Sequence, residues 1–550
     1  MRFRALPTLF CPAIVLVLSM AALPALGTDP TRTGLAAPRS YPGPGLHGEL
    51  ELALADAIAM GLENNLNVEI QRHAPLIAHE DARMAMGIYD PEWFSEMGWQ
   101  HVKNPNAFTL NLTLLNEEKT LDGIGGFRGL VPWLGATYSA TLESGQVETN
   151  STLQSRSPEY RSAVVFSGSI PLMKGLIWSE PWTLVKTTQV LYQGSTEEFR
   201  RNVMDIVQQI EDAYWALIAN DELVRVAEKS VETAQALLDQ VQIQYEVGVV
   251  SKVEIAQAEA GLAAREFDLI VAQNRYQTTM DVLIDLVLGS NLTADSRIQI
   301  VPTDRPDALV SYDVDVEEAA RIAFQRRPEL ALAQKDIERL EINVKFAKNQ
   351  RLPQFDIQSF YRMEGLGGSQ NPNLIDFTQD PPGPAAPGTV PERSWGSTFD
   401  NFFTSKAADS YGIRGFLSIP IPNTIGRRGV SKAQLELRRA RVAKRRVEQT
   451  IILEIRKAAR DLVSAHEGIG ASERQVVAAA EQLRAERIRL EYGESTPFDV
   501  LLKEQELVSA QQGKIDAFRV YRSSVTGLDR SQGTILRNRN VSIDQTARLR

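Results

Sequence analysis

The sequence predicts a mainly α-helical protein with membrane β-strands, in which long antiparallel helical hairpins extend from the strands. Three observations support this fold class. The chain contains an internal duplication, each half has a long proline-free stretch rich in helix-forming residues, and amphipathic extended segments precede each stretch. The protein is therefore expected to contain the same helix and strand series twice.

The duplication is visible as two gap-free alignments of the chain with itself. In the first, Pro91 meets Pro353, and in the second, Gly248 meets Gly493. Duplication on this scale defines the architecture, because each half then carries two short helices, a strand region and two long helices joined at a glycine. The aligned segments are 54–93 with 316–355, and 210–259 with 455–504. We expect a first repeat over 51–303 with its tip near 248, and a second over 304–530 with its tip near 493.

The N-terminus has the features of an export signal. Arg2 and Arg4 precede an apolar run, residues 9–26, that ends in the small-residue site Ala25-Leu26-Gly27. We expect residues 1–27 to be removed and residues 28–50, rich in proline and glycine, to form a flexible linker. Cys11, the only cysteine, lies within the signal, so thiol and disulfide chemistry are excluded from the mature chain.

Composition excludes several classes of function. The formal charge of -10 becomes -12 once Arg2 and Arg4 are removed with a signal that contains no acid, and an acidic balance argues against nucleic-acid binding. The five histidines show no metal-binding spacing, and no Ser/His/Asp or paired-carboxylate site can be assembled. The sequence therefore predicts a protein that is not an enzyme and holds no cofactor or metal. Residues 531–550 are predicted to be a disordered tail.

Any membrane crossing must use strands, because no segment after the signal has the roughly 20 apolar residues of a spanning helix. In the second half, residues 355–361 and 411–419 alternate in the manner of barrel strands, and the Gly/Pro-rich segment between them suits an external loop. The first half offers more candidates than one hairpin needs, and which of them cross the membrane stays open. They are residues 94–101, 108–115, 137–142 and 164–170. The glycine-rich segment 123–129 is expected to be a surface loop.

The longest predicted elements are the helices over 184–247 and 430–492, which contain no proline. At 1.5 Å per residue each forms a rod of roughly 90 Å, whose apolar stripe requires neighbouring helices. At the far ends, Gly248 and Gly493 can adopt the left-handed conformation that ends a helix. The next helices begin at predicted capping boxes, Ser251 with Glu254 and Thr496 with Asp499, and Pro497 is at the first helical position.

With this order of elements the chain resembles the TolC-like outer-membrane efflux protein family from Leu52 to about Leu528. The resemblance implies a homotrimer in the outer membrane, with helices extending into the periplasm. Each protomer would give four strands to a shared 12-stranded transmembrane β-barrel and its helical hairpins to a trimeric α-barrel tunnel. The implied function is an exit duct of a tripartite efflux pump or type I secretion system, conducting substrate passively from a periplasmic adaptor and an inner-membrane transporter.

The resemblance also implies roles for residues at the two tips. By position, the adaptor would dock on Val247, Gly248, Val249, Tyr492, Gly493 and Glu494. Asp499, and less directly Glu254, match the region where family members narrow the tunnel with acids, although both acids could serve only as helix caps. The alternative to a channel is a periplasmic coiled-coil scaffold or adaptor without a membrane barrel. Two strand regions placed symmetrically between the helices disfavour that alternative.

Overall fold

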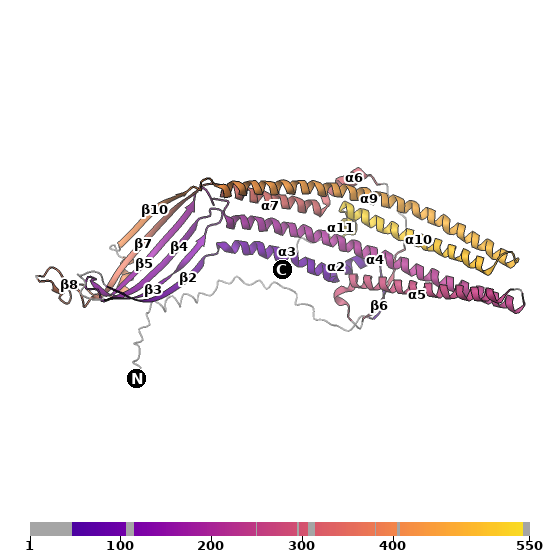
Figure 1. The fold of residues 1–550 in the computed structure, drawn as a ribbon, viewed down its shortest axis with the longest axis horizontal. Coiled ribbons are helices and arrows are strands. Elements are labelled where there is room, and N and C mark those ends of the chain that lie inside the picture. Colours follow the sequence, from indigo (N-terminus) through magenta and orange to yellow (C-terminus); the bar gives the residue numbers. More distant parts are fainter. Residues whose placement is uncertain are drawn as a thin grey trace, which may run out of the picture.

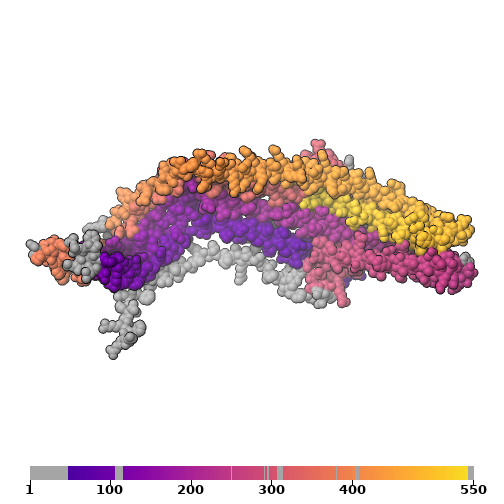
Figure 2. Space-filling model, in the orientation of Figure 1, coloured from indigo at the N-terminus to yellow at the C-terminus, as the bar shows by residue number. Residues whose placement is uncertain are grey.

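The computed structural model describes residues 47–105, 115–248, 250–293, 296–305, 314–379, 381–403 and 408–542. The predicted signal and residues 28–46 of the predicted linker lie outside this part of the chain. The molecule is long and curved, with a sheet at one end and two helical hairpin tips at the other (Figure 1). The space-filling view shows the helices running side by side along most of this length (Figure 2).

One antiparallel sheet contains six strands in the order β10-β7-β5-β4-β3-β2. All neighbours are antiparallel, and the strands are long enough to cross a bilayer, for which about 9 to 11 residues suffice. Their bounds are β2 Glu92–Pro105, β3 Leu115–Leu130, β4 Thr137–Thr149, β5 Arg156–Pro171, β7 Gln354–Gln370 and β10 Ala408–Ser418. β7 extends into the segment that the sequence assigned to an external loop.

The sheet has six strands, two more than the four per protomer that the sequence predicts for the barrel. Trp93 of β2 aligns with Phe355 of β7 in the duplication, and the same Ser-Ile-Pro motif occurs at the ends of β5 and β10, where β10 stops at the serine. The additional element is therefore the β3–β4 hairpin of the first repeat. The glycine-rich segment 123–129 lies inside β3, so its assignment to a surface loop is wrong. A Cβ atom on Gly126 would lie 2.2 Å from the Ala140 carbonyl oxygen, so only glycine fits this close strand approach.

The four long helices form two hairpins, as the sequence predicts. α4 spans Glu180–Glu246 and α9 spans Thr424–Glu491, with lengths of 67 and 68 residues. Each returns through a shorter helix, α5 (Lys252–Leu288) or α10 (Pro497–Gln532). Good helix formers and the absence of an interior proline explain this continuity.

Shorter helices complete a single layer of helices. α3 (Leu66–Met86) packs on α4, and α7 (Pro328–Gln350) packs between α4 and α9. Nearer the tips, α5 and α10 take the places of α3 and α7, so α4 and α9 run through both halves of the layer (Figure 1). The remaining helices and strands are α2 Leu54–Asn64, α6 Val316–Arg326, α8 Gly396–Phe403, β8 Ile375–Asp376, β9 Gly383–Pro384 and the 3₁₀ turns Gly87–Tyr89 and Gly289–Asn291.

The main core lies where α2, α4 and α5 meet a small parallel sheet. β1 (His47–Leu52) pairs with β6 (Arg297–Pro302), so the predicted flexible linker is wrong for residues 47–50. The fully buried Tyr214 donates its hydroxyl hydrogen to Leu52 or Asp304, whose oxygens lie 2.9 and 2.8 Å away. This buried phenol fixes the end of β1 against α4 because its polar atom is hydrogen-bonded.

The prediction of a disordered tail is wrong for residues 531–542. Gly533, with φ +74°, ends α10, and helix α11 (Ile535–Asn538) buries Ile535 and Leu536 in the main core. Arg539 donates two hydrogen bonds, of 2.7 and 2.9 Å, to the fully buried carboxylate of Glu211. The C-terminal segment thus closes the core and neutralises a buried charge. Residues 543–550 lie outside the described residues.

Candidate functional site: the sheet and the helical tips

The six-stranded sheet has two chemically different faces. On one, the paired residues of neighbouring strands are mostly large and apolar, including Trp93 opposite Phe127 and Phe166 opposite Tyr361. These side chains are exposed in the single chain, although large apolar side chains are usually buried in the protein interior. An exposed apolar face of this extent is what a lipid-facing wall requires.

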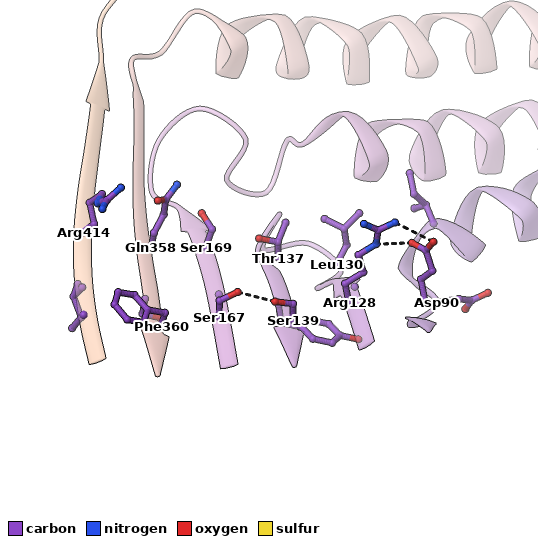
Figure 3. Close-up of a pocket in the computed structure, with 18 residues that line it drawn as sticks. Asp90, Arg128, Leu130, Thr137, Ser139, Ser167, Ser169, Gln358, Phe360 and Arg414 are labelled. Carbon is purple, nitrogen blue, oxygen red and sulfur yellow. Dashed lines mark hydrogen bonds and ion pairs between the residues drawn. The ribbon is translucent and has the colours of Figure 1, made fainter. Parts of the chain in front are cut away.

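The opposite face is lined mainly by polar side chains and forms a groove of about 930 Å³ near the helices (Figure 3). Arg128 donates hydrogen bonds of 2.8 and 3.1 Å to Glu92, and the Ser139 and Ser167 hydroxyls lie 2.7 Å apart. Further along the strands, Arg362 donates a 2.7 Å hydrogen bond to Glu143. Polar, hydrogen-bonded side chains suit a water-filled interior.

The first helical tip joins α4 to α5. Gly248 has a φ of +78°, which a residue with a Cβ adopts at a cost, and Val247 before it is exposed. Val249 lies outside the described residues. Ser251 precedes α5, but its hydroxyl hydrogen-bonds to the Glu254 carboxylate at 3.3 Å rather than to the helix backbone. The capping box predicted at this tip is therefore absent from the described structure.

The second tip joins α9 to α10 and follows the prediction closely. Gly493 has a φ of +73°, and Tyr492 and Glu494 beside it are exposed. Thr496 and Asp499 form the predicted reciprocal capping box, with the Thr496 hydroxyl 2.7 Å from the Asp499 carboxylate. Pro497 is buried in the first turn. Because the Thr496 hydroxyl and amide donate hydrogen bonds to it, the pKa of Asp499 is lowered from its ordinary value.

Replacement of Thr496 by alanine is expected to loosen the start of α10. Loss of a threonine N-cap costs about 1 kcal/mol, which is about fivefold in the local opening equilibrium. Hydrogen exchange of the first turn of α10 should accelerate by that factor. Ser251→Ala provides the matched control, because the Ser251 side chain accepts no hydrogen bond from the backbone of α5. Equal acceleration at the two tips would contradict the assigned capping box.

The tip halves of the two hairpins pack directly against each other. Leu237, Leu238 and Val241 of α4 share an apolar cluster with Leu483 and Leu490 of α9 and with residues of α5 and α10. A Cβ atom on Gly261 of α5 would lie 2.8 Å from a methyl carbon of Leu501 on α10. Glycine at this position thus permits this close approach of the two hairpins.

Two buried charged residues near this contact were not singled out by sequence reasoning. Glu504 of α10 is 3% exposed and Arg265 of α5 is 8% exposed. Within the part of the chain that is described, Glu504 Oε2 and Arg265 Nε have no hydrogen-bond partner. Burial raises the pKa of Glu504, while the positive charges of Arg487 and Arg265 lower it by less. A charged residue on a long helix has no sequence signal that separates a buried position from a solvated one.

This raised pKa predicts a pH dependence of tip packing. The folded-state pKa of Glu504 lies above its unfolded value. The stability that Glu504 contributes to the folded state is therefore fully present below the unfolded pKa, and it is lost as pH rises through the folded pKa. The Glu504→Gln variant should therefore protect α10 from hydrogen exchange more than the wild type does at pH 7.5. At pH 4, α10 should be protected from hydrogen exchange equally in the variant and in the wild type. An equal difference at both pH values would exclude Glu504 as the titrating group.

Among the described residues, no helix is both long enough and apolar enough to cross a bilayer. The same residues contain no group of three His, Cys, Asp or Glu side chains placed to hold a metal ion. The His79 ring packs against Tyr192, with 5.1 Å between the ring centroids.

Comparisons with known proteins agree with this geometry. A family model described as "Outer membrane efflux protein" matches residues 128–287 and 319–534, more than half of the chain. A search of curated proteins gave no match.

Among solved structures, the chain is similar to CusC, with 14% identity, coverage of 90% of this chain and 95% of that one, and a TM-score of 0.62. The Campylobacter jejuni CmeC outer-membrane channel is 14% identical, with 90% of each chain covered and a TM-score of 0.60. The open state of the Neisseria gonorrhoeae MtrE channel is 14% identical, with coverage of 88% and 89% and a TM-score of 0.59. These likenesses establish the fold.

Proposed function

Because the chain belongs to the outer membrane efflux protein family, an outer-membrane family of exit ducts for efflux pumps, we propose that it acts as a homotrimer that conducts substrate passively. The sheet forms the membrane wall, and the hairpins form a periplasmic tunnel. Energy comes from an inner-membrane transporter linked through a periplasmic adaptor. The observation that carries this proposal is the two-faced sheet, apolar on one face and polar on the other, joined directly to helices far longer than a globular core needs.

Exposed apolar side chains on the helical layer support assembly into a trimer. Helices α3 and α5 form one edge of the layer and α9 forms the other. Both edges carry large apolar side chains that are mostly exposed in the single chain, and burying them against a neighbouring copy would be favourable. They include Ile70, Ile77 and Met84 of α3, Phe267 and Ile270 of α5, and Leu435, Val442, Leu453 and Val477 of α9.

The tips provide the surface on which the adaptor docks. Val247 and Tyr492 are exposed beside the two turn glycines, and Tyr492 is 80% exposed. Large apolar and aromatic side chains presented on a rigid turn are typical anchors of protein interfaces. Glu494 gives the second tip a charge at the position where the first tip has Val249, so the two tips contribute different contacts. Val249 is included in this surface by its position in the sequence.

Gating follows from the contact between hairpins. Packed hairpins narrow the tunnel, and an adaptor that favours their separation opens it. Asp499 and Glu254 lie just past the two turns, where acids from three copies would form a ring. The Asp499 carboxylate accepts hydrogen bonds from Thr496, so its charge is held near the helix start.

Site-specific photo-cross-linking in cells tests the docking surface and the function together. A photoreactive residue at Tyr492 should capture a periplasmic adaptor, whereas the same residue at Ile425, which is 91% exposed at the sheet end of α9, should not. Removal of the gene should make cells accumulate toxic substrates, and the wild-type chain should restore efflux. Normal efflux in a strain that lacks the chain and every related duct would overturn the proposed function.

A further inference from the structure

A row of mostly aromatic side chains crosses all six strands of the sheet. Each member is paired directly with the next across neighbouring strands, so all of them lie on one face at one level. The first two rings, on β2 and β3, lie 4.8 Å apart between centroids. The row consists of Trp93, Phe127, Ala140, Phe166, Tyr361 and Tyr411.

The neighbouring row is mainly polar and lies on the opposite face. It begins with the ion pair of Glu92 and Arg128 and continues through the hydrogen-bonded Ser139 and Ser167. Only Phe360 departs from this pattern before the row ends at Gly412 of β10. Strands β2 and β3 therefore alternate between an aromatic and a polar residue in the same way as the other strands do. A hairpin that lay outside the membrane wall would need no such alternation.

The two edge strands of the sheet run in opposite directions, as an antiparallel pair requires. β2 begins after α3 and runs away from the helices, whereas β10 runs toward the helices and ends before α9 (Figure 1). With 14 and 11 residues, both are long, and no described strand pairs with the outer edge of either. Long unpaired edges attract further strands, and closing the sheet removes them. An edge pair of opposite direction can form an antiparallel seam between identical copies.

We propose that β2 of one copy pairs with β10 of the next, so that three copies close a wall of 18 strands instead of 12. This inference rests on the homotrimer of the proposed function. Because closing the wall staggers the strand register at each seam, the three aromatic rows together form one belt on the outer face at the membrane interface. Barrel diameter grows roughly in proportion to strand number, so the exit is about 1.5 times as wide as that of a 12-stranded wall.

Cysteine cross-linking tests the seam, because the only native cysteine lies in the predicted export signal. Trp99→Cys on β2 is combined in turn with three positions of β10 on the same face. One register should give covalent trimers after oxidation, since paired strands bring Cα atoms within disulfide range. The matched series replaces Trp99→Cys by Leu142→Cys on β4, which would form the edge of a four-stranded wall. The β10 positions are Tyr411, Ile413 and Gly415.

Cross-links from β2 support the 18-stranded wall, and cross-links from β4 overturn it while leaving the trimer intact. Imaging of the purified wild-type trimer gives an independent count. Eighteen strands around the wall confirm the inference, and twelve overturn it whatever the cross-links show. A preparation without threefold symmetry would instead contradict the homotrimer itself, so the two failures are distinguishable.

Discussion

The Arg539→Ala variant is expected to lose about 3 kcal/mol of stability, near the lower end of values for breaking a buried ion pair. Its partner Glu211 is fully buried and accepts hydrogen bonds from Arg539 and from the Thr526 hydroxyl, the latter at 2.6 Å. Removing the guanidinium leaves a buried carboxylate without its counter-charge. The loss is at the lower end because the Arg539 side chain is 23% exposed, which admits water.

Thermal unfolding in detergent should show this loss as a lower melting temperature. Arg537→Ala is the matched control, since Arg537 lies in α11, the short helix that ends directly before the C-cap residue Arg539, but is exposed. The double variant Glu211→Met, Arg539→Met should recover much of the loss, because it removes the buried charge together with its partner. Equal melting temperatures for Arg539→Ala and Arg537→Ala would show that the C-terminal segment does not close the core.

The Gly261→Val variant is expected to separate the two hairpins near their tips. Its side chain would clash with Leu501, since even a Cβ atom there lies 2.8 Å from that residue. Overpacking of this kind costs about 1 to 3 kcal/mol. A change of that size shifts a closed-to-open ratio by about 5- to 150-fold.

Single-channel recordings of the trimer should therefore show Gly261→Val open far more often than the wild type. Gly513→Val, on α10, is the control, because nothing lies within 4 Å of a Cβ atom built there. Adding Leu501→Ala to Gly261→Val should restore the closed behaviour by making room for the valine. Unchanged recordings for Gly261→Val would exclude this contact from the gate.

Elements with dense local signals were predictable from the sequence. α4 and α9 cover the two proline-free stretches as their composition indicates, and both turn glycines adopt positive φ. The Thr496 capping box formed because its two partners lie one turn apart, whereas Ser251 shows that the same spacing does not guarantee the bond. These features depend on interactions between residues that are close in the sequence, so a sequence pattern can predict them.

Features that depend on distant packing were missed. The glycines of β3 indicated a loop because a strand with so few side chains has little propensity of its own, and the neighbouring strand supplies the pairing. The C-terminal segment was predicted to be disordered from its arginines, although Arg539 finds a buried partner more than 300 positions away. Glu504 and Arg265 are likewise buried only because two hairpins meet. The local sequence around these residues contains no pattern that indicates these contacts.

We infer that this chain forms a trimeric outer-membrane duct, and direct imaging of the protein from its native membrane tests that inference. The full chain would be expressed with its signal, extracted from the outer-membrane fraction in mild detergent and imaged as single particles. We expect a threefold tube roughly 130 Å long, from about 100 Å of helix and about 30 Å of membrane wall. Release without detergent as monomers or short rods would contradict it.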